Sequence, residues 1–289
     1  MILQTRRTDS CLLEGPRSVP EPQPPASTPY AFDRTWSHEH ERLTALEQVY
    51  DPATTERLAA LGVAAGWACL ELGCGAGSVA RWLAERVGPT GQVLATDLDP
   101  RFAAGRGPAQ LTVRRHDLLV DPLPAGAFDL VHARALLEHL PGRDEALRRM
   151  LAATRPGGWV VVEDFDVAGP MGEAVARYWP EGHQLPAERL YRALAAAFAA
   201  AGADPGYGRR LPDALTEAGL TEVGAQVHGP LLTGGSAFLP LTLDQLRAPL
   251  LATGLLTEQQ LTELIEALTH PEARYLPNLM VTAWGRRPY

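Results

Sequence analysis

The chain has 289 residues, of which 46% are hydrophobic and 21% are charged, a composition ordinary for a globular protein. Its formal net charge is −8, whereas a nucleic-acid surface needs a basic stripe that neutralises phosphates. No apolar run approaches the roughly 20 residues needed to span a bilayer. We therefore expect a protein with no nucleic-acid partner and no membrane association.

The first 29 residues differ in composition from the rest of the chain. Six prolines fall between Pro16 and Pro29, and no apolar periodicity accompanies them. Because proline removes backbone donors and the segment has little to bury, we predict that residues 1–29 form a disordered extension. The apolar stretch at residues 11–13 is too short for the core of a signal peptide.

The three cysteines are Cys11, Cys69 and Cys74. An odd, sparse set forms no disulfide framework and has no metal-ligand spacing, so a reducing interior is the simplest interpretation. We therefore expect a cytoplasmic protein. No constellation of His, Asp and Glu indicates a metal site.

Apolar periodicity predicts two helices, at residues 38–50 and 52–61, and then a series of strands and helices. The strands are expected at residues 68–72, 92–97, 110–116, 128–132 and 159–163, with helices after the first strand and at residues 143–153. Strands that alternate with helices imply right-handed crossovers and a mostly parallel sheet.

The remainder of the chain is less regular. We predict an alanine-rich helix at residues 188–201, a strand at 222–228 and a final strand at 279–284. Thr257 and Gln260 fit a capping box, which opens an amphipathic helix.

A glycine-rich turn, residues 71–77 with the sequence ELGCGAG, joins the first strand of this series to its helix. Glycine alone lets a ligand pack against the backbone without a Cβ atom in the way. In doubly wound sheets, ligands bind in the crevice at this carboxyl end of the strands. A tight turn without a ligand is the simpler alternative, so the surrounding residues must decide.

Three features favour a nucleoside-sulfonium ligand over a dinucleotide. The dinucleotide fingerprint needs glycine where Ser78 stands. Glu71 places a carboxylate beside the turn, which suits a cationic ligand and is unfavourable beside a pyrophosphate. Asp117 follows the third strand, where an adenine amino group could be bound. Asp97, at the end of the second strand, suits the ribose of either ligand and does not choose between them.

Together these features resemble the ordered motifs of class I S-adenosylmethionine-dependent methyltransferases. The resemblance is carried by residues 71–77, by Asp97, by residues 116–118, and by residues 155–158 with the strand that follows. It covers residues 30–165 well and the remainder only in the order of the elements. Residues 41–43 and 274–281 also look similar to actinobacterial natural-product methyltransferases.

The resemblance implies an α/β fold, Rossmann-like and doubly wound. Its seven-stranded sheet would be mostly parallel, with an antiparallel last strand at residues 279–284. We expect a single domain over residues 30–289, with an N-terminal helical cap (30–66), a cofactor-binding half (67–165) and a substrate-side half (166–289). A helical insertion would occupy about residues 236–270, before the last strand.

The implied cofactor is S-adenosylmethionine, with S-adenosylhomocysteine as product. By resemblance, Asp97 would bind the ribose hydroxyls, Leu98 would flank the adenine and Asp117 would take its amino group. His132 would line the methionine end, and Arg134 would reach the methionine carboxylate. The full expected cofactor site is Glu71, Gly73, Cys74, Gly75, Gly77, Asp97, Leu98, Asp117, Leu118, His132 and Arg134.

Methyl transfer from a sulfonium is an in-line displacement, so holding the reacting atoms in line is the main task of the enzyme. A hydroxyl or acidic carbon acceptor also needs a base, which histidine supplies best near neutral pH. His139 is our candidate base, with packing in its loop as the alternative. We expect the acceptor site in residues 30–40, 171–185 and 229–254. Residues 178–180, 231–232 and Phe238 offer it an apolar lining, and packing in the core is the alternative for them.

Three functions remain open. The first is methylation of a small-molecule acceptor at O, N or C, in secondary metabolism. The second is a protein of this fold that uses the cofactor for another reaction, such as a cyclisation, or as a structural element. The third is a nucleotide-binding oxidoreductase, which Ser78 and Glu71 disfavour. A homodimer is left open.

Overall fold

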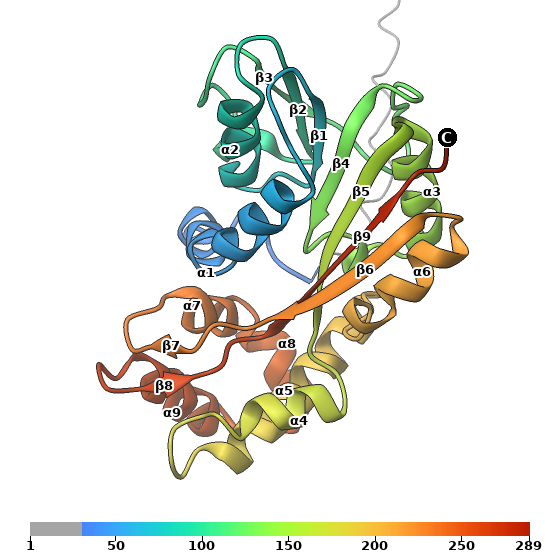
Figure 1. Cartoon of the computed structure of the whole chain (residues 1–289). Coiled ribbons are helices and arrows are strands. Elements are labelled where there is room, and N and C mark those ends of the chain that lie inside the picture. The colour runs from blue at the N-terminus through green and yellow to red at the C-terminus, as the bar shows by residue number, and fades with distance from the viewer. Residues whose placement is uncertain (1–30) are drawn as a thin grey trace, which may run out of the picture.

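The computed structural model describes residues 31–289, so the extension predicted at residues 1–29 lies outside the described residues. Its main sheet has seven strands in the order β3-β2-β1-β4-β5-β9-β6 (Figure 1). The strands are β1 Ala68–Leu72, β2 Gln92–Asp97, β3 Leu111–Arg115, β4 Phe128–Arg134, β5 Thr154–Asp166, β6 Thr221–His228 and β9 Leu279–Arg286.

The first five strands pair in parallel, and β9 runs antiparallel to both β5 and β6. The predicted doubly wound sheet with an antiparallel last strand is confirmed.

The central strands are buried on both faces, which explains their nearly continuous apolar sequence. Successive side chains point to opposite faces of a sheet. Accordingly, Leu130 of β4 packs in one buried cluster with Leu83, whereas its neighbour Val131 packs in another with Met150. Leu83 belongs to α2 (Ser78–Val87) and Met150 to α3 (Arg143–Ala153). The helices therefore cover the two faces, as Figure 1 shows.

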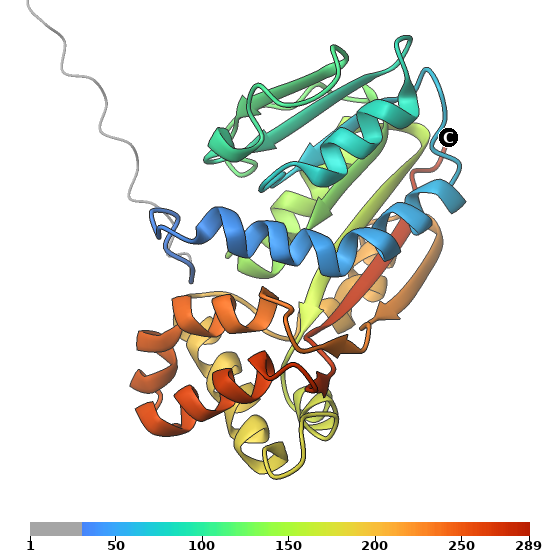
Figure 2. The ribbon, with the colours of Figure 1, turned by 90° about the vertical axis from the view of Figure 1, so that its left-hand side faces the viewer.

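The N-terminal helix α1 (Glu39–Ala60) is one continuous helix of 22 residues, so the prediction of two helices separated at Pro52 is wrong. Proline breaks the backbone ladder of a helix because it has no N–H. Here Thr55 donates its hydroxyl to the Asp51 carbonyl of the preceding turn at 2.8 Å. The buried side chain of Leu58, packed against the sheet, holds the second half in line. Figure 2 shows α1 lying across the molecule.

A second layer of helices lies at the carboxyl end of β5. Its members are α4 Pro170–Ala176, α5 Gln184–Ala200, α7 Phe238–Gln245, α8 Arg247–Ala252 and α9 Glu258–Thr269. They share one apolar cluster with Tyr50 of α1 and Phe165 of β5.

Two smaller features complete the fold. The predicted capping box of α9 is confirmed, with Gln260 N donating to Thr257 Oγ1 at 3.2 Å. A two-stranded sheet of β7 (Leu232–Thr233) and β8 (Arg274–Tyr275) flanks the helices, and α6 (Leu211–Glu217) packs on β9 and β6. Within residues 31–289, no helix has both the length and the apolar character required to cross a bilayer.

Tyr50 joins α1 to the chain just before β9. Its hydroxyl donates to the Asn278 carbonyl at 2.6 Å. Its ring packs in T-shaped geometry against Phe165 and Phe238, with ring centroids 5.3 and 5.4 Å apart. We expect Tyr50→Phe to lower the free energy of unfolding by about 1–2 kcal/mol, because it leaves a buried carbonyl without its donor. Urea denaturation measures this change. The same substitution at exposed Tyr178 is the control, and equal effects at the two positions would contradict the assignment.

Candidate functional site

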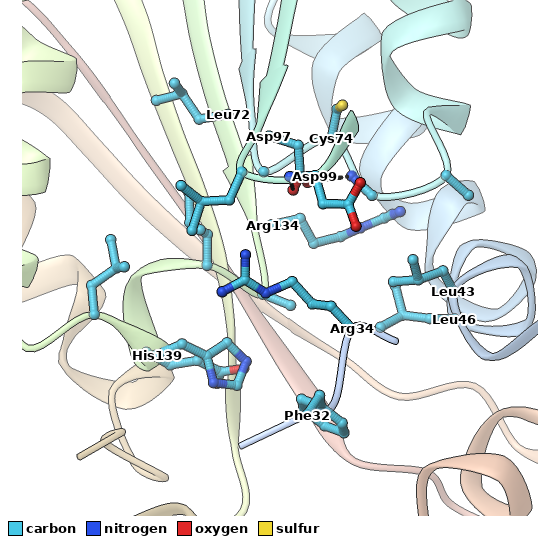
Figure 3. A pocket seen from close by; sticks show the side chains of 18 of the residues that line it. Phe32, Arg34, Leu43, Leu46, Leu72, Cys74, Asp97, Asp99, Arg134 and His139 are labelled. Atoms are coloured by element: carbon cyan, nitrogen blue, oxygen red, sulfur yellow. Dashed lines mark hydrogen bonds and ion pairs between the residues drawn. The ribbon is translucent and has the colours of Figure 1, made fainter. Parts of the chain in front are cut away.

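A cavity of about 330 Å³ lies at the carboxyl ends of β1, β2, β3 and β4 (Figure 3). It is bounded by the glycine turn, by the loops that follow the other three strands, and by α1, α5 and α7. This is the crevice in which doubly wound sheets bind ligands. Of the expected cofactor site, the lining contains Glu71, Gly73, Cys74, Gly75, Asp97, Leu98, Asp117, Leu118 and Arg134.

Two glycines of the turn serve different purposes. Gly75 has φ +54°, and a Cβ built there would come no closer to another atom than 3.6 Å, from Leu43, so its bare backbone faces the cavity. Gly77 has φ +90°, and a Cβ there would lie 2.9 Å from that of Ala103. Gly77 is therefore needed for packing of the turn and, unlike the prediction, does not line the cavity.

Asp97 fixes the glycine turn as well as facing the cavity. Its Oδ2 accepts a hydrogen bond from Gly75 N at 3.0 Å, and its Oδ1 accepts one from Asp99 N at 2.9 Å. Burial raises the pKa of Asp97 above its usual value, against the effect of these two bonds. Each carboxylate oxygen retains a second acceptor site, so Asp97 can still receive a hydroxyl donor from a ligand.

The loop after β3 supplies another polar wall. Asp117 Oδ1 accepts from Leu119 N at 2.9 Å, which leaves its second oxygen available. His116, beside it, lines the cavity, and both of its ring nitrogens are buried without a hydrogen-bond partner in the described chain. His116 was not among the predicted site residues, although the motif 116–118 contains it.

His132 lies behind the cavity rather than in its wall, which differs from the role implied by the resemblance. Its side chain is fully buried, with Nδ1 2.6 Å from Glu71 Oε2 and Nε2 3.3 Å from Glu163 Oε2. Burial alone would lower the pKa of His132, but the two carboxylates raise it to about 9. For Glu163, burial would raise the pKa, yet the bond from His132 and the charges of His132 and Arg134 lower it to about 2.

Arg134 connects this buried group to α1. Its Nη2 donates to Asp51 Oδ1 at 2.8 Å and its Nη1 to Thr54 Oγ1 at 3.0 Å. Thr54 in turn donates to Glu163 at 2.5 Å, and Ser78 donates its hydroxyl to Asp51 at 3.0 Å. Arg134 thus lines the cavity while its guanidinium is engaged with α1, an arrangement that the sequence did not reveal.

His139 lies on the far side of the cavity from Asp97, with the Arg34 side chain between them (Figure 3). Its ring contacts Phe32 and Phe198, with centroids 5.9 and 5.8 Å away. Burial, with a smaller contribution from the charge of Arg42, lowers the pKa of His139 to about 3. The imidazole is therefore neutral across the physiological range.

The predicted acceptor segments contribute unequally to the cavity. Residues 30–40 supply Phe32, Arg34 and Glu39, and residues 229–254 supply Phe238 and Thr242, but residues 171–185 supply none. Trp179 is buried in the apolar cluster instead, whereas Tyr178 and Leu231 are exposed. The sequence reasoning missed lining residues Phe198, Pro205 and Asn278, which no local pattern marks.

The methyltransferase domain model matches residues 36–205, more than half of the chain. The chain belongs to the methyltransferase domain family. Its fold is that of class I S-adenosylmethionine-dependent methyltransferases.

Two proteins of similar sequence are also named as methyltransferases. Methyltransferase str3 of Strobilurus tenacellus is 35% identical over 144 residues, which are 50% of this chain and 51% of that protein. Nocamycin O-methyltransferase of Saccharothrix syringae is 33% identical over 120 residues, 39% of this chain and 41% of that protein. The chain thus spans about half the length, or less, of these relatives.

Among solved structures, a phosphoethanolamine N-methyltransferase 2 of Haemonchus contortus superposes with a TM-score of 0.56 at 16% identity. The match covers 91% of this chain and 61% of that chain, whose structure contains phosphomonomethylethanolamine and S-adenosylhomocysteine. At this identity the likeness concerns the fold alone.

Folding should shift the pKa values of the buried His132 and His139 in opposite directions. An imidazole whose pKa rises from about 6.5 to about 9 on folding stabilises the protein fully below pH 6.5 and loses this contribution as the pH rises through 9. For His132 this loss is on the order of 3 kcal/mol. Histidine NMR titration should show His132 protonated at pH 7.5 and His139 neutral. A His132 signal that titrates near pH 6.5 would contradict the buried ion group.

Proposed function

We propose that the chain binds S-adenosylmethionine in this cavity and transfers its methyl group to a small molecule held at the opposite end. The observation that carries the proposal is one continuous cavity that runs from Asp97 and the bare backbone at Gly75 to a chamber beside His139. The aromatic residues that line this chamber are Phe32, Phe165, Phe198 and Phe238. In this proposal residues 67–165 form the cofactor-binding half, residues 30–66 form a cap over the cavity, and residues 166–289 form the substrate-side half. His139 belongs to the cofactor-binding half but lies next to the proposed acceptor.

The residues at the first end fit an adenosine. Gly75 leaves room against the turn, and Asp97 keeps free acceptor sites for two ribose hydroxyls. Asp117 has one carboxylate oxygen available for an amino group, and the buried ring nitrogens of His116 have no partner in the described chain. Leu98, which is 36% exposed, offers an apolar surface to a base. A pyrophosphate finds no comparable support, because Glu71 lies beside the turn and Glu47 accepts the Ser78 N–H at 3.0 Å.

When bound, the cofactor supplies a methyl group on a sulfonium, which leaves as a neutral thioether. The chain's own contribution is alignment, since rigid placement of a nucleophile can account for roughly 7–11 kcal/mol of a barrier. Asp97 and the glycine turn orient the nucleoside end. The rings of Phe32, Phe198 and Phe238, which line the other end of the cavity, orient the acceptor and exclude water.

His139 is proposed to accept the hydrogen bond of the acceptor's nucleophilic hydroxyl. Because burial and the charge of Arg42 disfavour the imidazolium, His139 is neutral before the acceptor binds, and a neutral imidazole can accept this hydrogen bond. An amine acceptor would need only to arrive unprotonated.

We further propose that the acceptor belongs to secondary metabolism. The relative named nocamycin O-methyltransferase supports this, as does the apolar character of the chamber. Formation of S-adenosylhomocysteine with candidate acceptors tests methyl transfer, whereas consumption of the cofactor without a methylated product would indicate another reaction.

Removal of the Asp97 carboxylate should weaken cofactor binding. A hydrogen bond to a charged group contributes about 1.5–3 kcal/mol, so we expect Asp97→Ala to raise the Kd for S-adenosylhomocysteine by roughly 10- to 150-fold. Isothermal titration calorimetry measures the Kd. Asp213→Ala, on an exposed position of α6, is the matched control. Equal affinities of Asp97→Ala and the control would remove Asp97 from the site.

Truncation of His139 should affect turnover rather than cofactor binding. We expect His139→Ala to lower kcat by roughly 2- to 12-fold with an acceptor hydroxyl, the factor for one neutral hydrogen bond that orients the nucleophile. Because His139 stays neutral above about pH 3, the rate of the unmodified protein should show no acidic limb near pH 6.5. His270→Ala, exposed and outside the cavity, is the control. Unchanged turnover in His139→Ala, or an acidic limb near pH 6.5, would contradict this role.

A further inference from the structure

Two polar side chains at the acceptor end of the cavity lack hydrogen-bond partners. Thr242 of α7 and Asn278, just before β9, are 4% and 5% exposed and both line the cavity. Neither Thr242 Oγ1 nor Asn278 Oδ1 makes a hydrogen bond to any part of the described chain. They come from elements far apart in the sequence, so the fold brings both to the same space.

Such groups are costly unless something outside the chain pairs with them. Burial of an unpaired amide or hydroxyl costs about 1–3 kcal/mol, and the large majority of buried polar groups in folded proteins are paired. Valine at 242 or leucine at 278 would fill similar volumes without this cost. The two side chains therefore indicate a polar ligand group at this end of the cavity.

The backbone holds both positions rigidly. The Asn278 carbonyl accepts the hydroxyl of Tyr50, and the next residue, Leu279, pairs with Asp166 in the main sheet. Thr242 lies within α7, where its carbonyl accepts from Leu246 N at 3.1 Å. Backbone hydrogen bonds therefore hold in place the residues that carry the Asn278 amide and the Thr242 hydroxyl.

The surroundings are apolar, and their charges are balanced. Phe32, Phe165, Phe198 and Phe238 line this end. The buried Arg42 guanidinium binds Glu39 through two hydrogen bonds of 2.8 Å, so it offers no unpaired positive charge.

Three further ionisable groups, Arg34, Glu138 and His139, agree with a neutral chamber. Arg34, which also lines the cavity, lowers the pKa of Asp97 through its charge and thus acts toward the nucleoside end. Burial raises the pKa of Glu138 and lowers that of His139, so both favour their uncharged forms.

We propose that Thr242 and Asn278 bind the acceptor, and that this acceptor is an uncharged, ring-sized apolar molecule with a hydroxyl or carbonyl group. The Thr242 hydroxyl both donates and accepts, and the Asn278 amide offers a donor and an acceptor, so either polar group is matched. The identification of this molecule as the methyl acceptor rests on the proposed function. The preference of the cavity for a polar group on an apolar ring does not depend on methyl transfer.

Naphthalene probes test the inference in protein loaded with S-adenosylhomocysteine. By fluorescence titration, 2-naphthol and 2-acetylnaphthalene should bind roughly 2- to 12-fold more tightly than 2-methylnaphthalene, the factor expected for one neutral hydrogen bond. Thr242→Val and Asn278→Leu should each reduce this preference, and the double variant should abolish it. Equal affinities of the three probes, or a preference unchanged in the double variant, would overturn the proposal.

A matched control separates binding from structure. Thr154 is also buried, but its hydroxyl donates to Met150 O at 2.8 Å and it does not line the cavity. Thr154→Val should lower stability and leave the probe preference intact, whereas Thr242→Val should leave stability equal or higher. Loss of stability in Thr242→Val with an unchanged preference would make Thr242 structural.

Two further measurements test the charge of the bound molecule and the dependence of binding on the cofactor product. Tighter binding of 2-naphthoate than of 2-naphthol would overturn the uncharged class. The titrations are also carried out without S-adenosylhomocysteine, so the binding preference is measured even if that molecule does not bind. Failure of S-adenosylhomocysteine to bind would count against the proposed function alone. The preference of the cavity and its loss in the double variant would still be measured.

Discussion

The buried chain Glu71–His132–Glu163 is the interaction on which the site depends, because it connects three neighbouring strands at their carboxyl ends. Two buried carboxylates would repel each other and lose their hydration, a penalty of several kcal/mol per ion. The imidazolium between them offsets this repulsion. Glu163 also accepts from Thr54 of α1 and from Thr282 of β9, at 2.5 and 2.6 Å. One carboxylate therefore ties the sheet to the helix that covers it.

The cover of the cavity follows from this arrangement. Arg134 extends the buried group to Asp51, and Asp51 accepts the hydroxyl of Ser78 at the start of α2. Since Glu47 also accepts the Ser78 N–H, α1 supplies the carboxylates that stabilise the N-terminus of α2. The glycine turn is thus held from both sides, by α1 and by Asp97. A loss of charge in the buried group should therefore loosen the glycine-turn side of the cavity even though His132 does not line the cavity.

The sequence predicted the fold well where the signal was local. Strands buried on both faces, the glycine turn and the capping box at Thr257 each follow from a short pattern, and Asp97 follows from its place at the end of a strand. Pro52 misled because α1 is stabilised by tertiary contacts that a propensity argument does not include. The engagement of His132 and Arg134, and the exposure of Asn278 to the cavity, depend on pairings across 31 to more than 200 residues of sequence. No local pattern carries that information.

The two ends of the cavity, which we propose bind the nucleoside and the acceptor, are built from different parts of the fold. The nucleoside end consists of loops fixed by the parallel sheet and by charged hydrogen bonds, in which a small displacement would leave buried charges unpaired. The acceptor end is formed largely by helices that share an apolar cluster, and such clusters tolerate volume-conserving substitutions at a cost below about 1.5 kcal/mol. Side chains of α7 can therefore change without disturbing the ion group around His132. Under the proposed assignment of the two ends, acceptor selectivity and cofactor binding can therefore vary independently.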